Sequence, residues 1–190
     1  MDAMRDEVCR VLAGINDPEM PISIVDLGIV DDVQVDSGRV TVRILPTFVG
    51  CPALDMLKDE IVCKTSVLPG VSRVEVSVAF DPPWTTDRIT PAGRENLRRI
   101  GITVPEHAGG DGSGVRRHSA VKTQESGVRT RDSELVQLGL PERLACPYCG
   151  STTTSLQSAF GPTRCRMIWY CSACKNQFEH MKRVGGGAER

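Results

Sequence analysis

Apolar side chains recur at helical spacing at the start of the chain, at Met4, Val8, Val11, Leu12 and Ile15. This i, i+3/i+4, i+7 pattern predicts an amphipathic helix over residues 2–15. Pro18 disfavours helical geometry at the residue before it, so the helix should end by the stretch NDPE.

The pattern then changes to strict alternation. Val33 and Val35 alternate with polar residues, the sequence DSG at 36–38 is typical of a turn, and RVTVRIL alternates again. These features predict a β-hairpin. A second alternating run, VSRVEVSVAF at 71–80, predicts a further strand.

Helical spacing returns twice. Leu54, Leu57 and Ile61 predict a helix that runs to about residue 67, where LPG breaks it. A shorter helix is predicted from Thr90 to Arg99, with Thr90 as its cap, a proline in its first turn and a glycine after its end. The order helix, strand, strand, helix, strand, helix predicts a small α+β domain over residues 1–105.

The composition changes after this domain. Residues 106–134 are rich in Gly, Ser and charged side chains, and they contain no aromatic residue. Such a segment cannot bury enough apolar surface to order itself, so we expect a flexible linker over 106–143. A small cysteine-rich unit should follow over 144–183, with a disordered tail at 184–190.

The charge balance argues against two classes of partner. The chain has 23 basic and 24 acidic side chains and a net charge of −1, which does not favour nucleic acid or an anionic membrane. No apolar run has the roughly 18 residues of a membrane helix, and the first residues lack the pattern of a signal peptide. We therefore expect a cytoplasmic protein without nucleic-acid or membrane partners.

Four of the eight cysteines form two C-x₂-C pairs, CPYC with Cys146 and Cys149 and CSAC with Cys171 and Cys174. Two such pairs can surround one tetrahedral ion. Between them, STTTSLQSAF alternates polar and apolar residues and RMIWY contains aromatic residues, so both stretches predict the short strands of a zinc ribbon. Ligand sets that include Cys165 or His180 are alternatives with poorer spacing.

Four thiolates would leave no open position on the ion for water or substrate, so the sequence predicts structural zinc. Iron is the alternative, because four sulfur ligands also suit an iron centre. The aromatic residues of this unit, Trp169, Tyr170 and Phe178, are predicted to form its core.

A separate cysteine lies in the stretch LPTFVGCPALD at 45–55. Pro52 suits the first helical position, which would place Cys51 at the helix N-terminus, where the dipole and free N–H groups favour a thiolate. An inert, buried cysteine is the alternative interpretation. Asp17, Glu19 and Asp26 lie on constrained backbone, and turn or cap functions suffice to explain Asp17 and Asp26.

The stretches DPEMPISIVDLGIV, PTFVGCPA and DPPWTTDRITPAGRENLRRIGI resemble the domain of iron–sulfur cluster assembly factors. Together with CPYCGS, SAFGPTRC and CSACKNQFEHMK, they resemble the PaaD-like family, whose members accompany a multicomponent phenylacetyl-CoA epoxidase. The resemblance covers roughly residues 5–105 and 144–183.

This resemblance implies an accessory role in the assembly or delivery of an iron–sulfur cluster. The partners that it implies are the oxygenase or reductase subunits of the epoxidase system and a second copy of the chain. By motif match, Cys51 is the functional cysteine, and Asp17, Glu19 and Thr47 fall in the matching stretches. A single thiolate would hold an iron–sulfur cluster only transiently, because a permanent cluster normally takes four protein ligands.

Two other functions remain open from the residues. A scaffold that docks oxygenase subunits through the ribbon would leave Cys51 inert. A cysteine-nucleophile enzyme fits less well, because Cys51 has no C-x-x-C partner and the histidines (His107, His118 and His180) lie outside the α+β domain. We therefore expect a protein that is not itself an enzyme.

Overall fold

The computed structural model describes residues 2–48, 50–105 and 144–182. The predicted linker and tail lie outside these residues. The α+β fold class is confirmed, and the predicted helices and strands of the first domain occur in the predicted order.

Three strands form the first sheet. The hairpin consists of β1 (Val30–Asp36) and β2 (Arg39–Ile44), which pair antiparallel around a turn at Ser37 and Gly38. β3 (Arg73–Val78) lies on the other side of β2 and runs parallel to it. A parallel pair needs a crossover connection, which α2 (Leu54–Ser66) provides.

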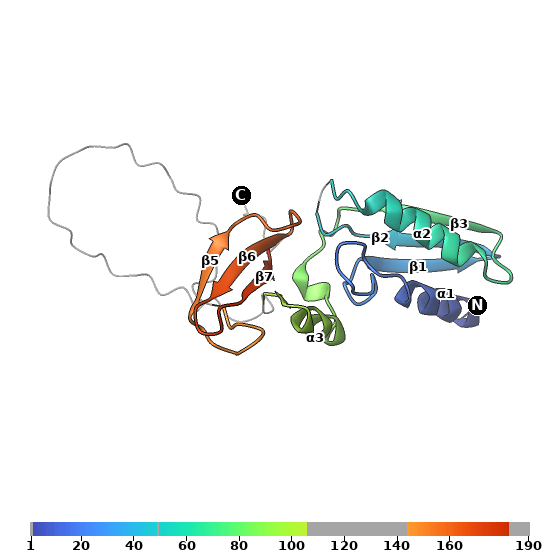
Figure 1. The fold of residues 1–190 in the computed structure, drawn as a ribbon. Helices are drawn as coiled ribbons and strands as arrows, with labels where there is room; N and C mark the ends of the chain where they lie inside the picture. The colour runs from blue at the N-terminus through green and yellow to red at the C-terminus, as the bar shows by residue number, and fades with distance from the viewer. Residues whose placement is uncertain (1, 49, 106–143, 183–190) are drawn as a thin grey trace, which may run out of the picture.

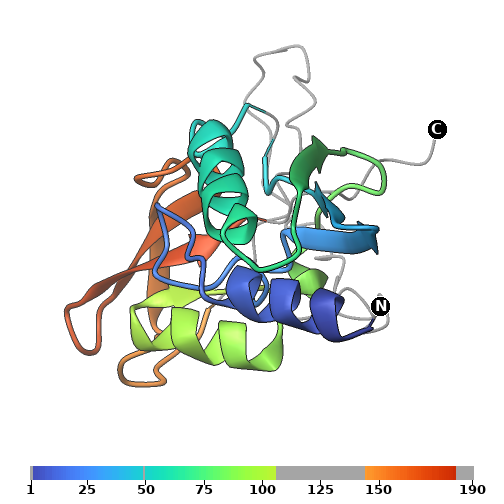
Figure 2. The same ribbon diagram turned by 90° about the vertical axis from the view of Figure 1, so that its right-hand side faces the viewer.

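The helices cover one face of this sheet. α1 (Asp2–Ala13) and α2 pack against each other and against the strands (Figure 2). Burial follows the predicted periodicity, since alternate residues of β2 are fully buried while their neighbours are more exposed. The core includes Val8 and Leu12 of α1, Val40, Val42 and Ile44 of β2, and Leu57 and Ile61 of α2.

The segment after β3 closes the domain. The indole N–H of the buried Trp84 donates to the Leu27 carbonyl at 3.0 Å. A short 3₁₀ helix (Thr86–Arg88) precedes α3 (Pro91–Arg99), which the Thr90 side chain caps by accepting the Gly93 N–H. The predicted cap, first-turn proline and helix end are confirmed.

One glycine in this region is required by close packing. Gly28 has a φ of +70°, and a Cβ at this position would lie 2.5 Å from the side chain and carbonyl of Arg88. The Arg88 guanidinium in turn donates to the Gly28 carbonyl at 2.9 Å. The loop before β1 is thereby held against the segment that leads into α3.

Residues 144–182, called the ribbon below, form a second sheet. Its strands are β5 (Thr154–Ser158), β6 (Arg166–Cys171) and β7 (Gln177–Met181), all antiparallel. The strands predicted within 151–160 and 166–170 are confirmed as β5 and β6, whereas β7 was not predicted. Trp169 and Phe178 lie in the core of this unit, each 3% exposed, as predicted. The prediction is wrong for Tyr170, which is half-buried and lies outside this core.

The ribbon sheet also contains a strand from the first domain. β4 (Ile102–Thr103) follows α3 and pairs parallel with β7, so the sheet order is β4-β7-β6-β5 (Figure 1). Met181 of β7 is fully buried in the core of the first domain. The ribbon is therefore joined to the first domain by hydrogen bonds and by apolar packing.

In the described part of the chain, none of the helices has the length and apolar character needed to span a bilayer.

Candidate functional site

The first candidate site is the group of four ribbon cysteines. The sulfur atoms of Cys146, Cys149, Cys171 and Cys174 all lie within 4.8 Å of one another. The Cys146–Cys174 and Cys149–Cys171 Sγ distances are both 3.6 Å. Zn–S bonds of about 2.3 Å in a tetrahedron place sulfurs about 3.8 Å apart, so the four thiols fit one tetrahedral ion.

Backbone amides support this site. The N–H groups of Cys174 and Ala173 point at the Cys171 sulfur and, together with the Cys149 and Cys174 thiols, lower the pKa of its thiol to about 7. The same contacts among the four thiols raise the pKa of Cys149 to about 12, so without an ion the negative charge is held mainly by Cys171. Such N–H···S contacts stabilise the thiolate that a metal requires. With four sulfur ligands the site is coordinatively closed, which fits a structural ion.

The alternative ligands of the ribbon lie elsewhere. His180 is buried, and its Nδ1 lies 2.8 Å from the Thr103 hydroxyl of β4, so this side chain joins the ribbon to the first domain. Cys165 is also buried, and its sulfur lies 3.1 Å from the Thr163 hydroxyl. Neither side chain belongs to the four-cysteine group.

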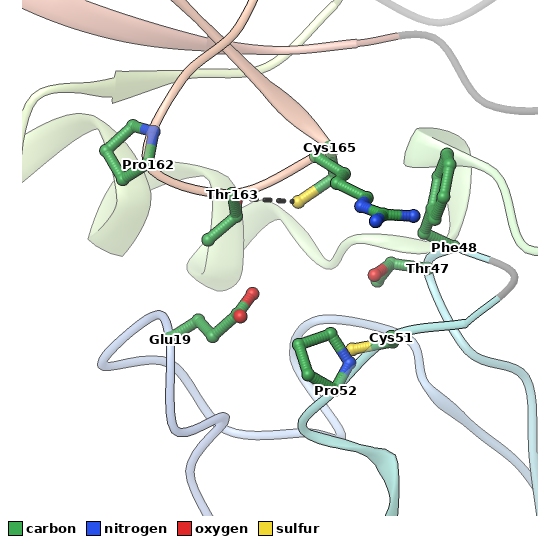
Figure 3. Close-up of a pocket in the computed structure, with 9 residues that line it drawn as sticks. Glu19, Thr47, Phe48, Cys51, Pro52, Pro162, Thr163 and Cys165 are labelled. Carbon is green, nitrogen blue, oxygen red and sulfur yellow. Dashed lines mark hydrogen bonds between the residues drawn. The ribbon is translucent and has the colours of Figure 1, made fainter.

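The second candidate site is a pocket of about 220 Å³ where the first domain meets the ribbon (Figure 3). One wall comes from the first domain and the other from the loop between β5 and β6. Its lining residues are Glu19, Thr47, Phe48, Cys51 and Pro52 from the domain and Pro162, Thr163, Arg164 and Cys165 from the ribbon.

The loop between β2 and α2 carries the Cys51 thiol to this pocket. Gly50 has a φ of +78°, which allows the sharp bend that the sequence suggested. The helix begins later than predicted, however, at Leu54 with Ala53 as its N-cap. The prediction that Pro52 is the first helical residue is therefore wrong, and Cys51 lies in the turn before the helix.

The predicted state of the thiol is also wrong. Cys51 is half-buried, and burial raises the pKa of its thiol, with the negative charges of Glu19 and Asp17 acting in the same direction. The Ala53 N–H lowers the pKa but does not outweigh these effects. The helix N-terminus therefore changes the pKa of Cys51 less than desolvation does. Cys51 is neither an exposed thiol nor a low-pKa thiolate.

Asp17 and Glu19 have different positions in the site. Asp17 is buried, and its Oδ1 accepts the N–H groups of Glu19 and Met20 at 2.9 Å each. Burial raises the pKa of the Asp17 carboxyl despite these two hydrogen bonds. Asp17 thus shapes the turn, while Glu19 lines the pocket, and in Figure 3 its carboxylate points toward the ribbon wall.

Two further residues complete this description. Thr47 is buried at 6% exposure in the pocket wall. Asp26 lies outside the pocket lining and accepts a 2.6 Å hydrogen bond from the hydroxyl of Thr90, so it holds the N-cap residue of α3 and is not itself a helix cap. Sequence reasoning missed the ribbon side of the pocket, and the only signal for it was the unassigned fifth cysteine, Cys165.

A buried arginine fixes the two walls of the pocket together. Arg166 of β6 pairs with Glu179 of β7 at 2.7 Å and donates through Nε to the Thr163 hydroxyl at 2.7 Å. Its other terminal nitrogen lies 3.5 Å from the Glu19 carbonyl. The turn that contains Glu19, called the Glu19 turn below, and the β5–β6 loop therefore both contact the buried guanidinium of Arg166.

Comparison with known families agrees with this architecture. Residues 5–78 match the family described as iron-sulfur cluster assembly protein. Residues 130–182 match the family described as PaaD zinc beta ribbon domain. The fold and the four-cysteine site thus define an iron–sulfur assembly domain joined to a zinc-ribbon module.

The whole chain is similar to one full-length relative. It is 34% identical over 178 residues to an Escherichia coli (strain K12) protein that is named as a subunit of a "Putative 1,2-phenylacetyl-CoA epoxidase". The match covers 93% of this chain and 91% of the relative. The chain therefore belongs to the PaaD family.

Relatives of the first domain alone are shorter. The Bacillus subtilis (strain 168) Fe-S protein maturation auxiliary factor YitW is 33% identical over 90 residues, which cover 47% of this chain and 88% of that protein. The Staphylococcus aureus (strain USA300) factor SufT is 37% identical over 75 residues, covering 39% of this chain and 85% of that protein.

Proposed function

We propose that this protein is an accessory factor that assists the assembly or delivery of an iron–sulfur cluster, and that Cys51 is the residue that handles the cluster. The observation that carries the proposal is the position of Cys51. Its half-buried thiol lines a pocket with a carboxylate and a buried hydroxyl, away from the closed four-cysteine site. The names of the first-domain relatives support the same role.

The recipient is proposed from the full-length relative. Its name links it to 1,2-phenylacetyl-CoA epoxidase, so we propose the oxygenase or reductase subunits of such a system as partners. Glu19 and Thr47 would help to position the cluster, and Asp17 would hold the turn that presents Glu19. The ion in the ribbon, which we propose to be zinc, would be structural.

A catalytic role is not proposed. The pocket lining contains no histidine, and His180 lies against Thr103 instead. A histidine that could act as the general base for a cysteine nucleophile is therefore not present among the residues that line the described pocket.

The test is co-expression of Cys51→Ala with the reductase and oxygenase subunits of a phenylacetyl-CoA epoxidase. We expect the variant to fold and to retain its zinc, while the iron and acid-labile sulfide content of the reductase falls severalfold. Cys63→Ala is the matched control, because Cys63 is an exposed thiol on α2. Full cluster content with Cys51→Ala would reject the proposed role.

A docking function is the second candidate, and one observation favours it. Phe160, in the loop that also forms the ribbon wall, is 79% exposed, with the Lys182 ammonium 5.1 Å from its ring centroid. An exposed aromatic side chain of this kind suits a contact with a partner protein. If docking is the function, Phe160→Ser should weaken co-purification with the epoxidase subunits, and Cys51→Ala should leave both co-purification and cluster content unchanged.

A further inference from the structure

The fifth ribbon cysteine, Cys165, lies in the same pocket as Cys51. The two residues belong to opposite walls, Cys51 to the first domain and Cys165 to the β5–β6 loop (Figure 3). Cys165 is 4% exposed, and its negative charge would raise the pKa of the Cys51 thiol. The pocket therefore brings together two cysteines that are distant in sequence.

The surroundings of Cys165 favour an oriented, metal-binding sulfur. Thr163 Oγ1 lies 3.1 Å from the Cys165 sulfur and accepts the Arg166 Nε–H at 2.7 Å. Since this N–H occupies one lone pair of the hydroxyl oxygen, the hydroxyl proton is available to the sulfur. The hydrogen bond with Thr163, whose hydroxyl is itself held by the Arg166 guanidinium, therefore fixes the orientation of the Cys165 sulfur.

The spacing of the pocket groups argues against a single ion as the ligand. In the described part of the chain, only the four ribbon cysteines bring three or more Cys, His, Asp or Glu ligand atoms within 4.8 Å of one another. Cys51, Cys165 and Glu19 do not form a group of this kind, whereas sulfurs on one tetrahedral ion gather about 3.8 Å apart. Ligands on different irons of a cluster are farther apart than ligands on one ion, so residues that line opposite walls of a pocket without gathering around one point suit a cluster.

The charges and the size of the pocket agree with such a ligand. An iron–sulfur cluster with thiolate ligands is anionic, and the Arg164 side chain contributes a positive charge to the lining. Glu19 adds a carboxylate oxygen as a further hard ligand. The pocket of about 220 Å³ is large enough for a small cluster and is open on one side to a partner.

We propose that Cys51 and Cys165 together bind the iron–sulfur cluster cargo, each through one thiolate to a different iron, so that the ribbon supplies a ligand as well as a fold. The inference rests on the proposed function and identifies the second protein ligand of the same site. Two thiolates leave coordination positions on the irons for ligands of the recipient.

Binding and release are ligand exchanges without a redox change. Each thiol loses one proton when its sulfur binds iron. On transfer, a thiolate of the recipient replaces each sulfur, and Cys51 and Cys165 take up a proton again. The cluster keeps its iron, its sulfide and its oxidation state throughout.

The experiment uses the full chain with zinc in the ribbon, reconstituted under anaerobic conditions with ferric iron, a thiol reductant and sulfide, followed by desalting. The wild type should retain iron and acid-labile sulfide in equal amounts. Cys165→Ser and Cys51→Ser should each reduce the retained iron at least tenfold without loss of zinc, and Cys63→Ser should retain the wild-type amount.

A second measurement tests the geometry without a cluster. Dibromobimane becomes strongly fluorescent when it joins two nearby thiols, and peptide mapping should find Cys51 and Cys165 joined in the zinc-loaded protein. The crosslink should be absent from either single variant. This measurement on the wild-type protein keeps the inference testable even if Cys165→Ser folds poorly, because the wild type needs no substitution.

The outcomes separate the inference from the proposed function. Loss of cluster in Cys51→Ser together with full retention in zinc-loaded Cys165→Ser would overturn the inference and leave the function standing. Full retention in both variants would overturn both. Iron retained without sulfide, or a failure of dibromobimane to join the two residues, would also overturn the inference.

Discussion

At the scale of single residues, the raised pKa of the Cys51 thiol favours its protonated form until a metal replaces the proton. Burial and the neighbouring Glu19 and Asp17 carboxylates raise its pKa. A metal that binds this sulfur must therefore displace a proton, and binding should weaken as the pH falls. A thiol of this kind is protected from adventitious alkylation and oxidation, since the thiolate is the reactive form.

The pH dependence of Cys51 alkylation tests this view. The rate with iodoacetamide should rise with pH and reach its midpoint above that of an ordinary thiol, because only the thiolate reacts. Glu19→Gln removes one of the negative charges that raise the pKa, so this variant should shift the midpoint to lower pH. The rates are measured by mass spectrometry of the peptide that contains Cys51.

The exposed thiol of Cys63 provides the internal control in the same samples. Its profile should be the same in the wild type and in Glu19→Gln. A Cys51 midpoint below that of a cysteine in an unstructured peptide would contradict the assignment and restore the low-pKa thiolate that the sequence suggested.

This residue also illustrates what a sequence alone can establish about a site. The position of Cys51 between a strand and a helix was predictable from local periodicity and from the adjacent glycine and proline. Its pKa was not, because the sign of the shift depends on burial and on Glu19 and Asp17, which lie on another loop. A helix terminus is visible in a sequence, whereas desolvation is a property of the folded chain.

At the scale of elements, the strands that were predicted have a local sequence pattern, whereas those that were missed depend on contacts between distant parts of the chain. β2 and β3 carry clear alternation, so their existence followed from the sequence. β4 has two residues and pairs with β7, far away in the chain, and neither strand has a periodic pattern long enough to recognise. Their pairing accompanies the burial of Ile102 and Met181 in the first core, a contact between distant parts of the chain.

The ribbon provides a prediction at this scale, because its core is small. Its buried cluster is limited to Cys146, Met167, Trp169, Cys171 and Phe178, two of which are metal ligands. Structural zinc stabilises such units by about 10 kcal/mol. Removal of the ion with a chelator should therefore unfold β5 to β7, shift Trp169 emission to longer wavelength and release about one zinc per chain.

The experiment is done in Trp84→Phe, in which Trp169 is the remaining tryptophan. Released zinc is measured with a colorimetric chelator, and Trp169 emission is recorded in the same sample. Cys149→Ser should reproduce the chelated spectrum, while Cys63→Ser should not. An unchanged spectrum after complete zinc release would show that the ribbon does not depend on its ion.

At the scale of the whole molecule, the first domain and the ribbon are held together by several kinds of contact. β4 pairs with β7, Met181 lies in the first core, and Arg166 links the ribbon to the Glu19 turn. Tyr148 of the first C-x₂-C pair also lies against Gly101, where an added Cβ would lie 2.0 Å from its hydroxyl. Because the pocket is formed between the two units, their relative position determines the distance between its walls.

We therefore expect the zinc-loaded protein to unfold in one cooperative step. The three α-helices in the described part of the chain belong to the first domain, and Trp169 belongs to the ribbon. In Trp84→Phe, far-UV circular dichroism thus reports mainly on the first domain and tryptophan fluorescence on the ribbon. Urea titrations followed by the two signals should have the same midpoint, as two-state unfolding requires.

Arg166→Met provides the matched perturbation, because it removes the buried cation that contacts the ribbon strands and the Glu19 turn. Both midpoints should fall together, since the loss of a buried partner destabilises a cooperative unit as a whole. If the fluorescence midpoint falls and the circular dichroism midpoint does not, the ribbon is an independent domain. The pocket walls would then be free to separate, and the distance between Cys51 and Cys165 would not be fixed by the fold.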